Sequence, residues 1–472
     1  VSAVLESLNI ALIFQLLRVV IEPEILRDIP FIGDYDFIQN VSDLNSLIIL
    51  ISIVISIAFV FKNTFLAYAL YAQKKFVTEA SARIGHRLLR RYLLTPYSRI
   101  FHRNSSELIN TAINMPPLIT SRIILPVIEI FTEAAIILGI GTVLFWNEPY
   151  VTTVVILSLL VVIGTFYGIT YRRFQGWGTA QTNLMGKILK IIQEGLAGQK
   201  VIRALRKEHF FLEAFFSSRL RLAKVDQYSS LFLALPRLLM EVLMILGISL
   251  VIILVFSQGR EPDELLAVLG LFAFAGLRIM PSFNRLLVSL STIRMGHTPI
   301  ETIFDDFDNL QILESLPPPE INSDTTAKFC FKNSLKLSKV NFTYPRSEKA
   351  ALSNVSFCIL RGQSIGLVGA SGAGKTTLAD IFLGLLNPYG GEIFCDGKIV
   401  DTTSHTWRKS IGYVPQEVFL IDDTVKRNVA LGVNDSEIDM DRLAQALELA
   451  SLTDVINDLP NLAETVVGES GF

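Results

Sequence analysis

Cysteine is scarce in this sequence, and a net charge of either sign is almost absent. Only three of the 472 residues are cysteine, and the spacing of Cys330, Cys358 and Cys395 fits neither a zinc site nor a disulfide framework. All three lie in the less hydrophobic C-terminal third, so we expect reduced thiols in a cytosolic domain. The formal net charge of −2 gives no indication of a nucleic-acid partner, and we expect none.

The start of the sequence carries no initiator methionine. The first residue is Val1, and the short charged-then-apolar pattern of a signal peptide does not follow it. The opening residues instead have the composition of a membrane helix. We therefore expect that the sequence begins partway into a longer protein.

Apolar residues, by contrast, are abundant. They make up 51% of the chain, and the mean hydropathy is +0.47, which is unusual for a soluble protein. About 20 apolar residues span a bilayer, and six stretches have this character. These stretches are residues 1–20, 47–71, 123–146, 151–171, 231–256 and 265–290. The sequence therefore predicts an α-helical membrane domain with six transmembrane helices.

The charges between the spans set their orientation. Residues 74–103 and 172–224 are rich in lysine and arginine, whereas residues 21–44 are mainly acidic. Basic loops stay on the cytoplasmic side, so both chain ends are expected in the cytosol. Both basic segments are long and poor in glycine and proline, which predicts that the membrane helices extend into the cytosol as rods. Each contains an aromatic, basic stretch, 95–104 or 203–216, that is either a solvated helical face or a contact site.

The last span carries two arginines, which are costly in a membrane helix. Arg278 and Arg285 are seven residues apart, so they share one helix face with Ser282. A central arginine costs roughly 2.5–3.5 kcal/mol to insert, and intramembrane ions therefore pair with one another or line a wet cavity. Glu129 and Glu133, one turn apart on the third span, are candidate partners. The sequence leaves two alternatives open, an ion pair between helices and contact with a charged substrate.

The composition changes after the sixth span. Residues 314–328 are polar and rich in proline, which is typical of a linker. Beyond them, strands, turns and helices alternate as in an α/β domain. We therefore predict a transmembrane domain over 1–312, a linker over 313–328 and an α/β domain over 329–472.

The segment 364–386 contains the residues with the clearest chemical role. It runs from an apolar strand through a glycine-rich turn into a helix, and Gly369 to Thr376 fit the pattern G-x-x-x-x-G-K-[ST] of the Walker A phosphate loop. Glycines let backbone N–H groups surround phosphate oxygens at a helix N-terminus. Lys375 can neutralise the β- and γ-phosphates, and the Thr376 hydroxyl can hold Mg²⁺. The sequence therefore predicts a P-loop NTPase domain that binds ATP and Mg²⁺.

Two further residues extend this candidate site. Tyr344 lies on a strand-like segment, 340–345, from which its ring can stack on adenine. Gln416 follows another apolar strand, in a loop from which it can reach Mg²⁺ and the attacking water. The predicted ATP-binding residues are Tyr344, Gly369, Ala370, Ser371, Gly372, Ala373, Gly374, Lys375, Thr376, Thr377 and Gln416, with Thr376 and Gln416 at the metal.

The order of these motifs resembles that of ABC transporter ATPase domains. Tyr344 matches the A-loop, 369–376 the Walker A motif and Gln416 the Q-loop. Six spans ahead of such a domain resemble an exporter-type half-transporter. The resemblance implies an ATP-hydrolysing translocase in the cytoplasmic membrane, with a cytosolic ATPase domain and a second half-transporter, expected to be identical, as partner. It also implies that 95–104 and 203–216 are coupling helices that press against nucleotide-binding domains.

The resemblance stops where the sequence stops. Residues 465–472, TVVGESGF, are similar to the stretch that precedes the signature LSGGQ in this family. The signature, the Walker B strand with its catalytic glutamate, and the switch histidine do not follow. We therefore expect a truncated sequence rather than a protein that has lost hydrolysis. Such a fragment has no catalytic residue of its own and is predicted to be inactive, although its parent would be an ATPase.

Two stretches of the membrane domain, 94–115 and 275–296, resemble PglK-type flippases of lipid-linked oligosaccharides. That resemblance implies an amphipathic, anionic polyprenyl-diphosphate sugar as substrate, with Arg278, Ser282 and Arg285 at its headgroup. Arginine suits a diphosphate because it stays charged and offers a planar fork of donors. The alternatives are an exporter of another lipid, a peptide or a drug-like molecule and, more distantly, an ATP-binding regulator that uses the membrane part as an anchor.

Overall fold

The computed structural model describes residues 44–100, 103–257, 262–310 and 331–468, apart from residues 346 and 417. The chain divides into two compact units, residues 1–320 and residues 321–472. The predicted span 1–20, the predicted linker 313–328 and Cys330 lie outside the described residues.

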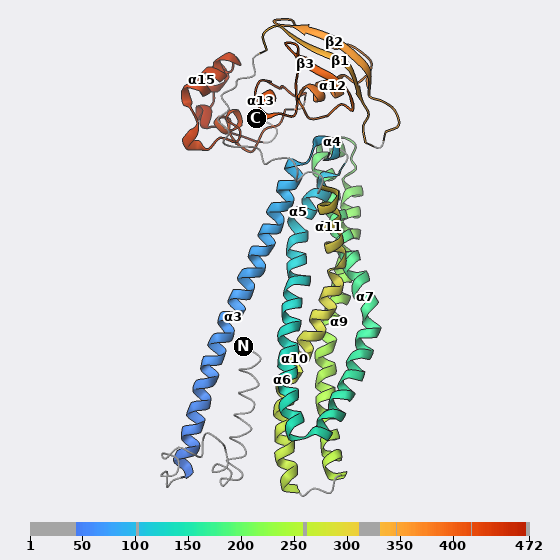
Figure 1. The fold of residues 1–472 in the computed structure, drawn as a ribbon, viewed down its shortest axis with the longest axis vertical. Coiled ribbons are helices and arrows are strands. Elements are labelled where there is room, and N and C mark those ends of the chain that lie inside the picture. Colours follow the sequence, from blue (N-terminus) through green and yellow to red (C-terminus); the bar gives the residue numbers. More distant parts are fainter. Residues whose placement is uncertain are drawn as a thin grey trace. The chain divides into compact units, whose positions relative to one another are not determined.

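The first unit consists of long helices (Figure 1). Five segments of the described chain are long and apolar enough to cross a membrane. The helices α3, α7 and α9 have 51, 49 and 50 residues, more than twice the length of about 20 residues that a bilayer requires. The prediction of helical rods that extend beyond the membrane is therefore confirmed in length. The helices are α3 (Leu44–Leu94), α4 (Tyr97–Ile100), α5 (Ser105–Ile119), the π-helix η2 (Thr120–Ile124), α6 (Leu125–Asn147), α7 (Pro149–Ala197), α8 (Gln199–Ala204), α9 (Glu208–Ser257), α10 (Pro262–Met295) and α11 (His297–Leu310).

The largest apolar core of this unit lies where α6, α7, α9 and α10 pack together. Ile140, Val151 and Val255 come from α6, α7 and α9, and each is at most 1% exposed. Leu271 and Ala275 of α10 complete the contact. Helix α10 lies against α6 (Figure 1). The polar face of α10 therefore has to be accommodated within a helix–helix contact.

A second core ties α3 to the other helices near the end of α3. Leu88 and Tyr92 of α3 are buried with Met115 of α5 and Ile303 of α11. The N-terminal part of α3 diverges from the other described helices of this unit (Figure 1). The packing of α3 within the described chain is therefore concentrated at the end where α5 and α11 meet it.

The second unit contains a four-stranded antiparallel sheet with the strand order β2-β1-β3-β4. The strands are β1 (Ser334–Phe342), β2 (Leu352–Leu360), β3 (Gly390–Cys395) and β4 (Lys398–Ile399). Helix α12 (Lys375–Phe382) packs on this sheet through Leu378 and Ile381, which meet Leu337, Val340 and Ile393 (Figure 1). The sheet thus supports the helix that follows the phosphate loop.

A smaller helical part completes this unit. Its elements are α13 (His405–Arg408), β5 (Asp423–Thr424), α14 (Val425–Val429), η4 (Asp435–Glu437), α15 (Met440–Leu449), α16 (Thr453–Asn457), η5 (Leu462–Glu464) and β6 (Val466–Val467). Strand β5 pairs with β6 in a separate antiparallel ladder. Leu443, Leu447 and Ile456 form the small apolar core beside it.

Two strands predicted from the sequence are not formed. Residues 363–369, before the phosphate loop, and residues 411–415, before Gln416, are irregular and pair with no described strand. Val368 and Val414 are consequently 98% and 93% exposed. Both segments are apolar, as a buried strand requires, but a strand also needs a neighbour for its backbone hydrogen bonds.

Candidate functional site

The phosphate loop is shaped by glycines in the left-handed region of backbone conformation. Gly372 and Gly374 have φ angles of +79° and +87°. A Cβ atom on Gly374 would lie 2.6 Å from the carbonyl oxygen of Ala351 and 2.8 Å from a methyl carbon of Leu352. Only glycine therefore lets the turn rest directly on the start of β2 before α12 begins.

Lys375, the first residue of α12, reaches back over the loop. Its Nζ donates hydrogen bonds to the carbonyl oxygens of Gly369 and Ala370, at 2.8 and 2.9 Å. Ala370, Ser371, Gly372 and the neighbouring loop residues through Ala373 are exposed. The loop therefore combines a fixed ammonium group, the N-terminal N–H groups of a helix and an accessible backbone, the features that bind a phosphate chain.

The next two residues of α12 have different environments. Thr376 is exposed, whereas Thr377 is buried, at 6%. The hydroxyl of Thr377 lies 3.1 Å from that of Tyr344. Thr376 is thus available to a ligand, and Thr377 holds the helix to the segment that follows β1. Further along α12, burial raises the pKa of the Asp380 carboxyl.

Tyr344 follows β1 rather than lying on it. The strand ends at Phe342, and Tyr344 sits two residues later, half-buried, with its ring edge-to-face against Phe342 at 5.0 Å between centroids. The prediction that Tyr344 belongs to a strand-like segment is therefore wrong in its local structure. Together with the contact to Thr377, this packing places the tyrosine beside the phosphate-loop helix.

Gln416 is not joined to this cluster. It is exposed, and no hydrogen bond between described residues links it to Lys375 or Thr376. The structure thus brings together Tyr344, the phosphate loop and α12, and leaves Gln416 in an irregular segment. Its proposed contact with a metal ion stays a prediction.

The polar face of α10 is partly satisfied by α6. Arg285 forms a two-point ion pair with Glu133, in which its Nη2 donates to Oε2 at 3.2 Å and its Nε pairs with Oε1. The Ser289 hydroxyl donates to Glu129 at 2.7 Å. Ion pairing between helices, one of the two alternatives left open by the sequence, is therefore present for Arg285.

The remaining stripe residues differ in exposure. Ser282 is 0% exposed, and its hydroxyl oxygen is buried without a hydrogen-bond partner among the described residues. Arg278 is half-buried, and the Arg285 side chain is 45% exposed. Ser282 therefore lies inside the helix packing of the described chain. Only the two arginines present accessible charge.

Asp306, a buried carboxylate on α11, was not predicted from the sequence. Asp306 of α11 is 3% exposed, accepts a hydrogen bond from the Tyr92 hydroxyl at 2.5 Å and pairs with Arg103 at 2.7 Å. Burial acts to lower the pKa of Arg103, but the hydrogen bonds and charges of Asp306 and Glu107 outweigh it and raise that pKa. Asp306 occurs three residues after Ile303 on the apolar face of α11, and this spacing was the available signal.

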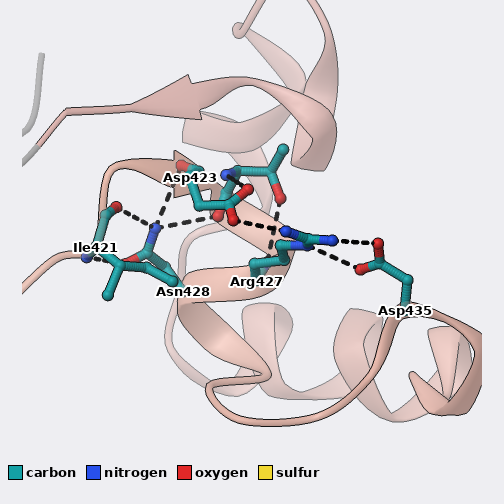
Figure 2. A network of polar contacts seen from close by, with 6 residues as sticks. Ile421, Asp423, Arg427, Asn428 and Asp435 are labelled. Carbon is teal, nitrogen blue, oxygen red and sulfur yellow. Dashed lines mark hydrogen bonds and ion pairs between the residues drawn. The ribbon is translucent and has the colours of Figure 1, made fainter. Parts of the chain in front are cut away.

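The second unit has a charge cluster of its own, at the junction of β5 and α14 (Figure 2). Arg427 donates to both carboxylate oxygens of Asp435, at 2.9 and 2.5 Å, and to Asp423 at 2.8 Å. These contacts raise the pKa of Arg427 and lower the pKa values of Asp423 and Asp435. Asn428 bonds both backbone groups of Ile421, at 2.8 and 3.0 Å. The cluster orders the loop between 421 and 435.

Membrane-length helices followed by a unit with a Walker A loop define a membrane transporter with an ATP-binding domain. The chain belongs to the ABC transporter family. The ABC transporter transmembrane region matches residues 24–276, and the ABC transporter domain matches residues 352–469. The predicted fold class, an exporter-type helical membrane domain joined to an ABC ATPase domain, is confirmed.

Named relatives and one solved structure agree with this assignment. The chain is 28% identical over 346 residues to an ATP-dependent lipid A-core flippase of Ralstonia nicotianae, covering 73% of this chain and 57% of that protein. It is 29% identical over 350 residues to an ATP-dependent lipid A-core flippase of Aliivibrio fischeri, covering 73% and 58%. The structure of a bacterial Atm1-family ABC exporter with ATP bound superposes with a TM-score of 0.73 at 18% identity, covering 100% of this chain and 80% of that one. The chain therefore spans less than two thirds of the length of the two flippases.

Proposed function

We propose that this protein is half of an ATP-driven transporter that moves an amphipathic, anionic lipid across the cytoplasmic membrane. The observation that carries the proposal is the ordered phosphate loop, with Lys375 held across it, in a chain whose membrane helices belong to the ABC transporter family. The names of the relatives indicate a lipid, and the resemblance to PglK-type flippases favours a lipid-linked oligosaccharide. Another lipid, a peptide or a drug-like molecule is the alternative substrate.

The residues present fit ATP. The loop 369–373 is exposed, and Gly372 has open space where a Cβ atom would stand, so phosphate groups have room to approach the backbone. Lys375 would exchange its two carbonyl contacts for β- and γ-phosphate oxygens, and Tyr344 would flank the base. Thr376 would hold Mg²⁺, which neutralises charge on the phosphates, and Gln416 would join Thr376 at the metal.

The residues proposed to bind substrate are Arg278 and Arg285. The Arg285 charge is already balanced by Glu133, so a headgroup has to share it or displace the carboxylate. Arg278, half-buried and two turns away on the same face, is proposed as a second contact for a phosphate group. Ser282 lies between them and is 0% exposed, so it becomes available to a substrate only if the packing around α10 opens.

The working unit is proposed to be a homodimer. In this family each ATP is sandwiched between two nucleotide-binding domains, and one set of six spans encloses no complete path. Crosslinking of the full-length protein in native membranes is expected to trap a dimer. A preparation that is monomeric while it hydrolyses ATP would contradict this part of the proposal.

The central test uses the full-length protein reconstituted in liposomes with fluorescent lipids. Lys375→Ala is expected to abolish ATP-dependent flipping and to weaken ATP binding, without loss of membrane insertion. Lys349→Ala, at an exposed lysine of the same unit, is the matched control and should leave both activities intact. Undiminished flipping by Lys375→Ala would overturn the proposal. A polyprenyl-diphosphate oligosaccharide and lipid A-core, offered separately, distinguish the two lipid classes.

A further inference from the structure

Helices α10 and α11 are separated by a short break that a glycine and a proline in the sequence explain. Helix α10 ends at Met295 and α11 begins at His297, with Gly296 between them. Pro299 lies four residues after Met295 and has no N–H group. The carbonyl of Met295 therefore lacks the donor that a continuous helix would supply, whereas the N–H and carbonyl of Gly296 still bond to Thr292 and Ile300.

Arg122 supplies the missing donor. Its Nη1 donates to the carbonyl oxygen of Met295 at 3.3 Å, and Arg122 itself is only 9% exposed. It lies in the π-helix η2, where the N–H of Leu125 bonds to Thr120, five residues back. Pro126 lies four residues after Arg122 and has no N–H to donate to its carbonyl. Two proline-dependent irregularities thus meet through one arginine, and π-turns of this kind often mark functional positions.

The same guanidinium is also tied to α7 and α9. Its Nη2 pairs with the side-chain oxygen of Gln181 on α7, and Gln181 donates to Asp226 of α9 at 2.9 Å. The carboxylate of Asp226 therefore faces the arginine through one amide group, which offsets part of the cost of burying its charge. Arg122 connects four helical segments.

The backbones at this point are in direct contact. A Cβ atom added to Gly178 of α7 would lie 2.6 Å from the Met295 Cα atom and 2.8 Å from its carbonyl carbon. One residue later, the Thr179 hydroxyl lies 2.7 Å from that of Thr298 on α11. The junction is thus held by α7 on one side and by Arg122 on another, so a change at Arg122 acts on a packed hinge.

We propose that Arg122 is the positioning residue that makes α10 and α11 move as one body. The inference rests on the proposed function, because α11 leads along the chain to the ATPase unit and α10 carries the proposed lipid-binding arginines. With the Arg122 contact in place, a displacement of α11 is passed to α10. Without it, Gly296 becomes a loose hinge, and ATP is hydrolysed without moving lipid.

The first experiment measures the hinge directly and requires no transport. Cys330, Cys358 and Cys395 are replaced by serine, and spin labels are attached at Leu277 of α10 and Phe304 of α11, both 61% exposed. The distance between the labels is measured by pulsed electron resonance in lipid nanodiscs. The labelled protein with Arg122 intact is expected to give a narrow distribution of distances. Arg122→Gln is expected to give a distribution roughly twofold wider or more, as for a released hinge.

The second experiment measures coupling in the reconstituted full-length protein. For Arg122→Gln, the number of lipids flipped per ATP is expected to fall about tenfold or more while ATP hydrolysis continues. Arg122→Lys should restore the ratio partly, because lysine keeps the charge and a donor but cannot make both contacts. Arg83→Gln, at a side chain 76% exposed on α3, is the matched control.

The results of the two experiments either support or overturn the proposed role of Arg122. An unchanged distance distribution, or a wide distribution with an unchanged ratio of lipid to ATP, overturns the proposal. If Arg122→Gln does not fold, Asp226→Asn keeps the arginine and removes the charge that orients it through Gln181. This variant should widen the distribution to a smaller degree, and no widening counts against the proposal. If the parent flips no lipid at all, the proposed function fails, whereas the distance measurement still decides whether Arg122 holds the hinge.

Discussion

The two units of this protein each contain an arginine held by a carboxylate at two points, and the two pairs have opposite surroundings. Arg285 meets Glu133 between α10 and α6, where the Glu133 side chain is 8% exposed. Arg427 meets Asp435 on the second unit, where the two side chains are 47% and 50% exposed (Figure 2). The local geometry is similar, so any difference in energy comes from the solvent around each pair.

The comparison separates what an ion pair looks like from what it contributes. Charges in apolar surroundings interact strongly, but each must be removed from water, so loss of one partner leaves a costly unpaired charge. Charges in water are screened, and the loss of one partner is compensated by solvation. We therefore expect the membrane pair to matter for folding, and the exposed pair to act mainly on the local order of its loop.

The largest effect is expected from Glu133→Gln. This change leaves the Arg285 guanidinium without its carboxylate, at an expected cost of about 3 kcal/mol, the lower end for a buried pair because Arg285 is 45% exposed. Thermal unfolding in lipid nanodiscs measures it. The double variant Glu133→Gln, Arg285→Gln should recover part of the loss, since no isolated charge remains.

The control for this experiment is Arg237→Gln on α9. Arg237 pairs with Glu241 within one helix at 3.4 Å, and the side chains are 75% and 50% exposed. Its loss should cost no more than about 0.5 kcal/mol. Equal losses for Glu133→Gln and Arg237→Gln would show that the Arg285 pair is solvated like a surface pair.

The next effect concerns a neutral side chain in the second unit. Asn428, half-buried beside the Arg427 pair, bonds the N–H and the carbonyl of Ile421 and also reaches the carbonyl of Thr424 (Figure 2). Asn428→Ala leaves these backbone groups unsatisfied, and we expect a loss of about 1–2 kcal/mol. Thermal unfolding followed by a probe in this unit measures it. A loss smaller than that of Asp435→Asn would reverse the expected order of the neutral and charged contacts.

The sequence predicted the elements that depend on neighbouring residues in the chain. The phosphate loop could be recognised because its glycines and Lys375 lie within the short segment 369–376, and the helices because their apolar runs are long. The strand at 364–368 was not formed, since a strand requires a partner that composition alone does not show. Asp306 and Arg122 were missed for a related reason: each is satisfied by residues more than 50 positions away.

The predicted pairing of the α10 arginines illustrates the same limit. Periodicity placed Arg278 and Arg285 on one face and identified Glu129 and Glu133 as possible partners. Only the structure shows that Arg285 pairs with Glu133, whereas Glu129 accepts a hydrogen bond from Ser289. The choice depends on the register between α6 and α10, which side-chain volumes along the whole contact determine.

A smaller effect is expected from Arg285→Lys. Lysine retains the charge but offers a single ammonium group in place of the planar fork that meets both oxygens of Glu133. Loss of one of the two contacts should lower stability by about 1 kcal/mol. The same nanodisc unfolding measurement applies. A loss as large as that of Glu133→Gln would indicate that the two-point geometry, and not the charge, stabilises this contact.

The smallest effect is expected from Asp435→Asn, and it should depend on pH. The hydrogen bond and charge of Arg427 hold the pKa of Asp435 below its ordinary value of 3.8, and Arg427 lowers the pKa of Asp423 in the same way. A carboxyl group with a lowered pKa stabilises the folded state above its ordinary pKa, and this contribution is lost as the pH falls through the folded-state value. The difference in unfolding temperature between the unsubstituted protein and Asp435→Asn should therefore be small near neutral pH and disappear as the pH falls through the lowered pKa of Asp435. It should also shrink in about 1 M salt, where charges in water are screened within roughly 3 Å. A large difference that persists in acid and in salt would show that the exposed pair behaves like the Arg285 pair in the membrane unit.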